Sequence, residues 1–317
     1  MGFLSRVHGH LWTVYPRFRH DLLGAAPPPS RHWTTTGRDP EVGEFRLSGR
    51  YHAGRQDELL IVVHGLGGSH RSSYAIDAAL AAERAGISCL RLNLRGADRK
   101  GRDFYHAGLT ADLRAVFVSD LVRAHRTVYL LGYSLGGHVT LRFVEDPPPS
   151  LCAAATICAP LDLEAGANEI DQPKGRVYRR HVLRGLKEIY RGVAAKRAVM
   201  VPTEDADGID TIRGWDETII APRFGFASAE EYWRTQSAGP RLANVNVPTL
   251  MVIARRDPMV FFQTLERFLP AASPIDARIL DRGGHVGFPP GVDLGDGASG
   301  GIEDQVLHWL RRRLRER

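Results

Sequence analysis

The sequence predicts an α/β fold in which a mostly parallel central sheet is flanked by helices and carries a helical insertion. The first observation is that short, continuous apolar runs alternate with amphipathic stretches at helical spacing. The second is that this alternation stops after about residue 160 and resumes near residue 247. Continuous apolar strands that alternate with helices indicate a parallel sheet covered on both faces, and the interruption indicates an inserted segment.

These observations divide the chain into three parts. Residues 1–40 are aromatic and basic and are broken by three consecutive prolines, so we expect an N-terminal arm that packs on the body. Residues 41–160 and 247–317 form the expected α/β core. Residues 161–246 form the expected helical lid insertion, because they follow the strand after the central motif described below, where a lid would cover a site.

The elements of the first part of the core are expected in a regular order. An outer strand comes first, and four apolar strands follow it, which gives strands at residues 45–51, 58–63, 87–94, 127–131 and 153–158. Helices are expected at residues 72–86 and 110–125 and directly after Ser134. The helix at 110–125 is expected to be continuous, because apolar residues recur along it at helical spacing.

The second part of the core is expected to complete the same sheet. In the insertion, Val182, Leu186, Ile189 and Val193 form one apolar stripe of a basic helix. Strands follow at residues 249–254 and 277–280, and a closing helix at residues 301–315 turns its apolar side inward.

Composition excludes several classes of protein. The chain has 317 residues, of which 43% are hydrophobic and 25% are charged, so it is long enough to bury a large core. The formal charge of +6 is carried almost entirely by arginines that surround no nucleic-acid-binding module, so we expect no nucleic-acid partner. The basic helix of the insertion could contact a membrane surface or an acidic partner, and a solvated helix face over a pocket is the expectation we favour.

Further patterns bear on location and cofactors. No apolar run approaches the length of a membrane span, and no signal-peptide core opens the sequence. The three cysteines make no Cys-x-x-Cys pair, which favours a reducing, cytoplasmic location. The stretch from Gly65 to His70 departs from the dinucleotide-binding pattern, because His70 replaces its last glycine. No histidine or cysteine cluster has metal-ligand spacing, so we expect neither a cofactor nor a metal.

The central motif is a serine between two glycines at a switch from strand to helix. Ser134 follows an apolar strand and precedes a helical pattern, with Gly132 and Gly136 on either side. Such a turn strains the serine backbone and brings strand and helix close, so both flanking positions need glycine. It would also raise the serine hydroxyl above the sheet, with a helix N-terminus behind it to stabilise negative charge.

An acid and a histidine complete a candidate catalytic triad. Asp257 and His285, like Ser134, each follow a predicted strand, so all three lie at the carboxyl edge of the sheet. In this arrangement His285 takes the proton of Ser134, and Asp257 fixes the tautomer of the imidazole. Asp276 and Asp281 are rivals that lie nearer to His285 in sequence. His106 and His138 are the other histidines worth testing, whereas His64 is expected to hold a loop through hydrogen bonds.

The oxyanion that forms during acyl transfer needs preorganised backbone donors. Leu135, directly after the serine, offers one N–H group. Leu66, in the glycine loop after His64, offers the other. The side chains at these two positions matter little, because only the backbone would contact the oxyanion.

With these residues in view, the chain resembles the YheT-like group of the α/β-hydrolases. The resemblance covers most of the chain after about residue 55 and is carried by His64-Gly65-Leu66-Gly67-Gly68-Ser69, Asn93-Leu94-Arg95-Gly96, Tyr105-His106-Ala107-Gly108, Ser134-Leu135-Gly136-Gly137, Trp215-Asp216-Glu217-Thr218, Phe224-Gly225-Phe226, Ala229-Glu230-Glu231-Tyr232-Trp233, Val247-Pro248-Thr249-Leu250, Asp257-Pro258 and Gly283-Gly284-His285-Val286-Gly287-Phe288. It implies the α/β-hydrolase fold and a serine hydrolase that acts on carboxylic esters, among them lipid esters. By motif match it also assigns Ser134, Asp257 and His285 as the triad.

We therefore expect an enzyme that hydrolyses small-molecule carboxylic esters through an acyl-enzyme at Ser134. One alternative is an acyltransferase, in which an alcohol or thiol replaces water in deacylation. Another is a non-catalytic homologue that binds lipid or protein. A haloperoxidase or dehalogenase is less favoured, since a dehalogenase would carry an aspartate in place of Ser134.

Overall fold

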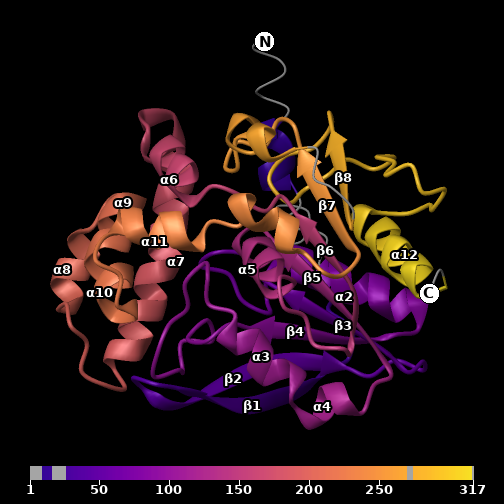
Figure 1. Ribbon diagram of the computed structural model, residues 1–317, viewed down its shortest axis with the longest axis horizontal. Helices are drawn as coiled ribbons and strands as arrows, with labels where there is room; N and C mark the ends of the chain where they lie inside the picture. The colour runs from indigo at the N-terminus through magenta and orange to yellow at the C-terminus, as the bar shows by residue number, and fades with distance from the viewer. Residues whose placement is uncertain (1–8, 16–25, 270–273, 316–317) are drawn as a thin grey trace.

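The computed structural model describes residues 9–15, 26–269 and 274–315 of the chain. Its centre is an eight-stranded sheet whose strands are β1 (Arg31–Asp39), β2 (Gly43–His52), β3 (Glu58–Val63), β4 (Ser88–Asn93), β5 (Thr127–Tyr133), β6 (Leu151–Ile157), β7 (Thr249–Ala254) and β8 (Ile275–Leu280). The strand order is β1-β2-β4-β3-β5-β6-β7-β8. β2 runs antiparallel to both neighbours, and the strands from β4 to β8 pair in parallel. The sheet is therefore mostly parallel, as predicted (Figure 1).

Successive residues of a strand point to opposite faces of the sheet, so a strand that is apolar throughout makes both faces apolar. Helices cover both of these faces. On β3, Leu59, Ile61 and Val63 belong to one apolar cluster, whereas Leu60 and Val62 belong to the other. The first cluster also contains residues of α3 (Ala111–Phe117) and α5 (Leu135–Phe143), and the second contains residues of α2 (Ser73–Ala85) and α12 (Ile302–Arg315). The two clusters explain why the central strands are apolar without alternation.

Two segments differ from the expected elements. The helix expected at 110–125 is split into α3 and α4 (Asp120–Arg123). Val118 is 61% exposed, and the Ser119 hydroxyl donates a hydrogen bond to the carbonyl of Val116, so the first helix ends there. In addition, residues 31–39 of the expected N-terminal arm pair with β2 as the edge strand β1. Most of the remaining arm lies outside the described residues.

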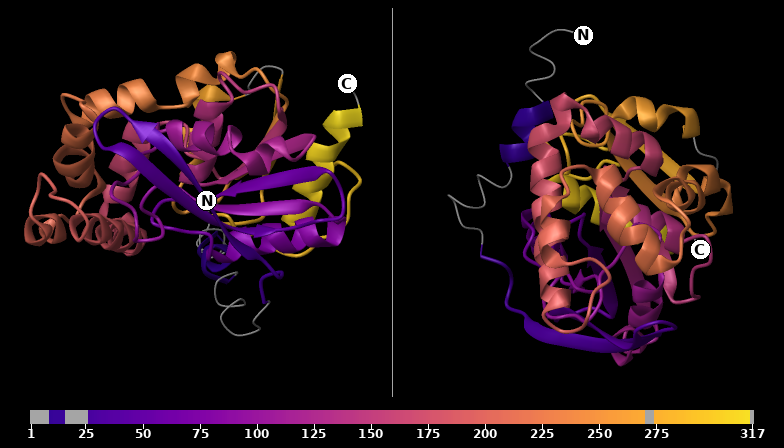
Figure 2. Two further views of the ribbon diagram at one scale, coloured as in Figure 1. Left: turned by 90° about the horizontal axis from the view of Figure 1, so that it is seen from below. Right: turned by 90° about the vertical axis from the view of Figure 1, so that its left-hand side faces the viewer.

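The segment between β6 and β7 is helical. It contains α6 (Leu163–Asp171), α7 (Arg176–Ala194), α8 (Thr203–Gly208), α9 (Ile212–Trp215), α10 (Ala221–Phe224) and α11 (Ala229–Gln236). Figures 1 and 2 show most of these helices together at one end of the molecule, beside the sheet and not in it. The long helix α7 buries the predicted stripe of Val182, Leu186, Ile189 and Val193.

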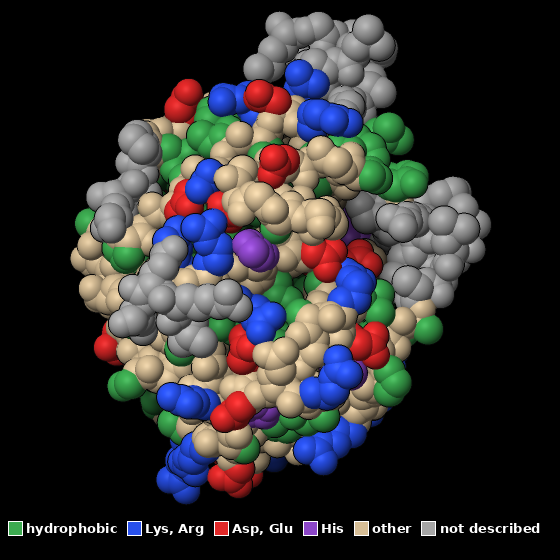
Figure 3. All heavy atoms as spheres, turned by 90° about the vertical axis from the view of Figure 1, so that its right-hand side faces the viewer, with side chains coloured by type: hydrophobic (Ala, Val, Ile, Leu, Met, Phe, Trp, Pro, Cys, Tyr) green, Lys and Arg blue, Asp and Glu red, His purple; other side chains and the backbone are tan. Residues whose placement is uncertain are grey.

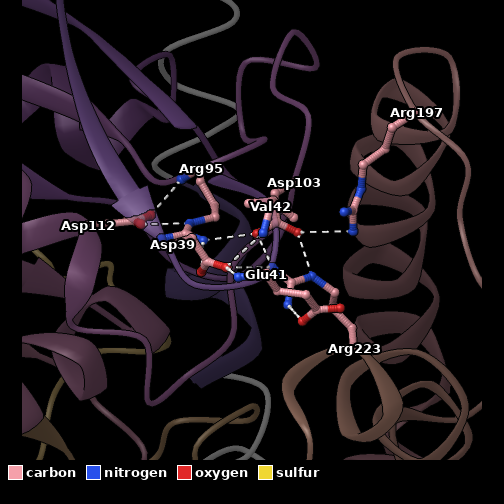
Figure 4. A network of polar contacts seen from close by, with 8 residues as sticks. All are labelled: Asp39, Glu41, Val42, Arg95, Asp103, Asp112, Arg197 and Arg223. Atoms are coloured by element: carbon pink, nitrogen blue, oxygen red, sulfur yellow. Dashed lines mark hydrogen bonds and ion pairs between the residues drawn. The ribbon is translucent and has the colours of Figure 1, made fainter. Parts of the chain in front are cut away.

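A buried network of charges links this helical segment to the core (Figure 4). Its centre is Arg95, in the loop after β4, whose side chain is 1% exposed. The Arg95 guanidinium lies 2.7 Å from Asp39, 2.9 Å from Asp103 and 2.8 Å from Asp112. The ring of Phe45 lies 3.8 Å from the guanidinium carbon and closes the site on one side. Three carboxylates thus surround one buried arginine.

Arg223 of α10 supplies the second buried cation of the network. Its side chain is 5% exposed and donates to Asp103 at 2.6 and 2.9 Å, and it also contacts Asp39 and Glu41. Because Asp103 receives hydrogen bonds from Arg95 and Arg223 together, the helical segment is fixed to the core through a shared carboxylate. The Arg95 side chain also lowers the pKa of Asp39 to about 2, against the effect of burial.

Replacing Arg223 with methionine should therefore destabilise the fold. The change leaves Asp103, which is 1% exposed, with Arg95 and the more distant Arg197 as its remaining cations, and breaking a buried ion pair in this way costs about 3 kcal/mol in the free energy of unfolding. Urea denaturation measures it. The matched control is Arg123→Met, because the Arg123–Asp120 pair is 68% and 100% exposed and should contribute less than about 1 kcal/mol. Equal losses in both variants would contradict a stabilising role for the network.

The surface mixes charges of both signs. On the face shown in Figure 3, basic and acidic side chains lie next to one another, and no broad area of one sign stands out. In the part of the chain that the structure describes, no helix has the length and apolarity needed to cross a membrane.

Candidate active site

The serine turn sits where strand β5 passes into helix α5. Ser134 has φ +51° and ψ −121°, a backbone conformation that residues other than glycine rarely adopt. A Cβ atom at Gly132 would overlap the carbonyl of Gly136, and one at Gly136 would overlap the carbonyls of Val63 and His64. The prediction that both flanking residues must be glycine is confirmed. The Ser134 N–H donates to Ile157 of β6 at 2.9 Å and holds the turn on the sheet.

Asp257 and His285 lie together at the ends of β7 and β8. His285 Nδ1 is 2.8 Å from Asp257 Oδ2, and both residues are buried, at 7% and 5% exposure. The other oxygen, Oδ1, accepts hydrogen bonds from the N–H groups of Met259 and Val260 at 2.8 and 2.9 Å. The carboxylate is therefore fixed, and its bond to Nδ1–H leaves Nε2 of the imidazole as the nitrogen able to accept a proton.

The two rival acids lie elsewhere. Asp276 bonds to Arg278 and accepts a hydrogen bond from the indole of Trp309. Asp281 pairs with Arg255 and its side chain is 76% exposed. Neither carboxylate has a hydrogen bond to His285 among the described residues, so of the three candidate acids the structure brings Asp257 to the histidine.

Ser134 and His285 line one cavity of about 970 Å³. Within the described part of the chain, no hydrogen bond joins Ser134 Oγ to His285, whose ring contacts Asp257 and whose backbone N–H contacts Thr13. In hydrolases without substrate the bond between nucleophile and base is often long and shortens when substrate binds. The arrangement thus brings the three predicted residues to one edge of the sheet.

The glycine loop after β3 lines this cavity and carries the predicted oxyanion donor at Leu66. The N–H of Gly65 donates to the Tyr74 hydroxyl at 2.9 Å, and the N–H of Gly67 donates to the Tyr105 hydroxyl at 2.8 Å. Leu66 lies between them and lines the cavity, and no hydrogen bond to its N–H is found among the described residues. Two tyrosines therefore fix the backbone on both sides of a free donor.

Leu135 offers a second N–H group at the same cavity. It is the first residue of α5, and the first N–H groups of a helix have no partner inside the helix. The first backbone bond back to the turn is from His138 to the Ser134 carbonyl, at 3.1 Å. The positive end of the α5 dipole therefore points toward the serine turn.

His64 is fully buried behind the glycine loop and is held on both ring nitrogens. Nδ1 lies 2.8 Å from the Gly65 carbonyl, and Nε2 accepts the N–H of Leu94 at 3.2 Å. Burial lowers the pKa of His64 to about 4, so the ring is neutral near pH 7. The expectation that His64 holds the loop through hydrogen bonds is confirmed.

The other two histidines are also buried. Burial lowers the pKa of His106 to about 3, and its Nδ1 accepts the N–H of Gly108. His138 of α5 lies between the carbonyls of Pro160 and Gln236, at 2.8 and 2.9 Å. His138 therefore connects the serine helix to the residue before the helical segment and to the last residue of α11. Neither histidine has a hydrogen bond to Ser134 or Asp257 among the described residues.

The helical segment forms one wall of the cavity. Helix α7 approaches the glycine loop so closely that a Cβ atom at Gly185 would lie 2.8 Å from the Cα of Gly67. Apolar side chains from several of its helices line the cavity, among them Ile170, Val182, Leu186, Trp215 and Ile220. A volume of about 970 Å³ is at the upper end of the range of small-molecule sites, and an apolar lining suits an extended hydrocarbon group.

Asp216 and Glu217, from the Trp215-Asp216-Glu217 sequence of this segment, accept hydrogen bonds from residues of α11. The indole of Trp233 donates to Asp216 Oδ2 at 2.7 Å, and the N–H of Ala229, at the start of α11, donates to Glu217 at 2.7 Å. Burial raises the pKa of Asp216 to about 7. Asp216 also lines the cavity, as do other titratable side chains such as Asp162 and Glu188.

Two residues near the site escaped the sequence analysis. Cys158, after β6, has φ +52°, and its thiol lies with Asp257 and His285 in a group whose ligand atoms are within 4.8 Å of one another. Spacing along the chain gives no sign of this group, although the position of Cys158 at the end of a strand could have suggested it. Burial raises the pKa of the Cys158 thiol, which keeps it protonated and a poor metal ligand.

The second residue is Thr13, which the sequence gives no reason to connect with the site. Its hydroxyl accepts a hydrogen bond from the N–H of His285 at 2.8 Å, and it lines the cavity. It lies in a helical segment at residues 9–15, hereafter the N-terminal helix.

Comparisons with known proteins agree with this architecture. Residues 60–291 match the Alpha/beta hydrolase family. The chain is 31% identical to "Putative esterase YheT" of Escherichia coli (strain K12) over 95% of this chain and 89% of that protein. It is 28% identical to "Putative esterase slr0264" of Synechocystis sp., over 66% and 68% of the two chains. The alpha/beta hydrolase GrgF from Penicillium sp. sh18 has a similar structure, with a TM-score of 0.57 and 19% identity over 90% of this chain and 99% of that chain.

Proposed function

The chain belongs to the alpha/beta hydrolase family, and we propose that it is a serine hydrolase that cleaves carboxylic esters with Ser134 as nucleophile, His285 as base and Asp257 as the orienting acid. The observation that carries this proposal is the 2.8 Å bond between His285 and Asp257 at a cavity that Ser134 also lines. The esterase names of the two relatives support the same reaction.

The geometry of the site supports the following first half of the proposed reaction. His285 Nε2 takes the proton from Ser134 Oγ as the oxygen attacks the ester carbonyl. Asp257 stabilises the imidazolium that forms, because its carboxylate already holds Nδ1–H. The N–H groups of Leu66 and Leu135 donate to the carbonyl oxygen as it becomes negative. His285 then gives its proton to the leaving alcohol, and an acyl-enzyme remains on Ser134.

The second half repeats these steps with water. His285 removes a proton from a water molecule, which attacks the acyl carbonyl, and the same two N–H groups stabilise the oxyanion. The proton returns to Ser134 Oγ as the free acid leaves. No step uses a cofactor or a metal ion.

The proposed substrate is an ester with an apolar, lipid-like acyl chain, and the proposed lid is the helical segment of residues 161–246. Both rest on the apolar side chains that α7 and its neighbours contribute to the cavity. Each methylene buried there contributes about 0.8 kcal/mol, which corresponds to roughly fourfold in kcat/KM until the cavity is filled.

A panel of p-nitrophenyl esters with acyl chains from short to long tests this function. We expect hydrolysis of the panel with kcat/KM rising along the shorter members, and free acid as the product. Ester formation on an added alcohol in preference to hydrolysis would favour the acyltransferase. If no member of the panel is cleaved, the non-catalytic binding homologue becomes the better interpretation.

A further inference from the structure

The N-terminal helix packs against both loops that carry the proposed acid and base. A Cβ atom at Gly9 would overlap the carbonyl of Arg256, the residue before Asp257. A Cβ atom at Gly284, the residue before His285, would overlap the carbonyl of Gly9. The helix therefore touches each loop backbone to backbone, one residue away from the proposed catalytic side chain.

Thr13 makes the polar contact between this helix and the histidine loop. Its hydroxyl donates to the Gly9 carbonyl at 2.8 Å and accepts the His285 N–H at 2.8 Å. The first bond fixes the orientation of the hydroxyl, so its lone pair faces the His285 backbone. No other partner of the His285 N–H is found among the described residues, and a valine at position 13 would leave that donor unsatisfied beside the cavity.

The histidine loop needs such an external contact. Gly283 and Val286, on either side of His285, have φ +140° and +54°, and a positive φ is unfavourable for a β-branched residue such as valine. Strained conformations persist only where neighbouring contacts determine them. One internal bond, from Gly284 N–H to the Gly287 carbonyl at 2.9 Å, closes the loop, and the Thr13 bond attaches it to the N-terminal helix.

The same helix also touches the helical segment over the cavity. His10 Nδ1 lies 2.6 Å from the Tyr178 hydroxyl of α7, and the two rings stack with their centroids 5.7 Å apart. Thr13 and Val14 line the cavity itself. The N-terminal helix is thus a wall of the cavity that bridges the histidine loop and α7.

We propose that Thr13 is a positioning residue for His285, through which the N-terminal helix holds the imidazole in line with Ser134. The proposal rests on the function proposed above, since it gives His285 the role of base. Thr13 contacts the His285 backbone and the Tyr178 side chain, and it touches no reacting atom. Its loss should therefore change the alignment of the base and leave the acyl pocket in place.

The test compares Thr13→Val with Thr13→Ser. Valine keeps the shape and removes the hydroxyl, so kcat for a p-nitrophenyl ester should fall roughly 10- to 100-fold with KM nearly unchanged, as expected for a misplaced catalytic group. Serine restores the hydroxyl and should restore most of kcat. A Thr13→Val variant as active as wild type, or an equal loss in both variants, would overturn the proposal.

A second pair of variants tests the same proposal if Thr13→Val does not fold. Gly9→Ala should displace the N-terminal helix from the Arg256 carbonyl and lower kcat to a similar extent. The matched control is Gly208→Ala in α8, where a Cβ atom would meet nothing within 4 Å. Equal kcat values for the two alanine variants would count against a role of the N-terminal helix.

A measurement without substrate separates this proposal from the proposed function. The backbone amide of His285 should exchange with solvent at least about tenfold faster in Thr13→Val than in wild type, because its only partner among the described residues is lost. If wild type cleaves no ester, the proposed function fails while this readout still decides the role of Thr13. Unchanged exchange would overturn the positioning role in either case.

Discussion

Replacing Ser134 with alanine should lower kcat for ester hydrolysis by roughly 10⁴-fold or more, as the loss of a nucleophile does in other triads. The expected loss is this large because the proposed acyl-enzyme cannot form without Oγ, whereas the proposed backbone donors at Leu66 and Leu135 remain. No hydrogen bond from Ser134 Oγ to a described residue is found, so the variant should keep the stability of wild type. Steady-state kinetics measure kcat, and thermal unfolding measures the stability of the variant.

A fluorophosphonate probe gives the same variant a chemical test. The probe reacts with an activated serine, so it should label wild type and leave Ser134→Ala unlabelled. Equal labelling of the two proteins would place the nucleophile elsewhere.

The second large effect is expected for Asp257→Asn. With its one amide oxygen on the backbone N–H groups, asparagine presents its NH2 group to His285 Nδ1, which favours the wrong tautomer and removes the charge that stabilises an imidazolium, so kcat should fall by roughly 10⁴-fold, as for the corresponding change in other triads. The side chain keeps its size, and one oxygen can still accept the N–H groups of Met259 and Val260. Binding of substrate, measured as KM, should therefore change little.

Asp281→Asn is the matched control for this prediction. Asp281 lies nearer to His285 in sequence, yet its side chain is 76% exposed and pairs with Arg255. Its variant should keep kcat within about twofold of wild type, since surface ion pairs contribute little. A loss of activity in Asp281→Asn with full activity in Asp257→Asn would show that Asp281, and not Asp257, is the acid of the triad.

The sheet and the serine turn could be predicted from the sequence because both depend on local signals. Residues 59–63 are apolar at every position because both faces of their strand are buried, and the strand before Ser134 is likewise buried along its whole length. The glycines on either side of Ser134 are needed because a Cβ atom there would overlap the backbone, and this requirement can be predicted from the sequence motif. The order of strands also placed Asp257 and His285 at one edge.

Other features depend on contacts between distant parts of the chain. The sequence pattern continues through Val118 and Ser119, and the break between α3 and α4 arises from a side-chain bond to the backbone. Arg95 and Arg223 are 128 positions apart, and only the fold shows that they share Asp103. The contact of Thr13 with His285 spans 272 residues and leaves no periodic pattern to find.

Trapping the acyl-enzyme tests the role of Ser134 as nucleophile most directly. Wild-type protein is mixed with a p-nitrophenyl ester, quenched in acid within one turnover, digested and analysed by mass spectrometry. We expect an added acyl group on the peptide that contains Ser134, and none in Ser134→Ala. Turnover of the ester with no acyl group on that peptide, or with the group on another residue, would contradict it.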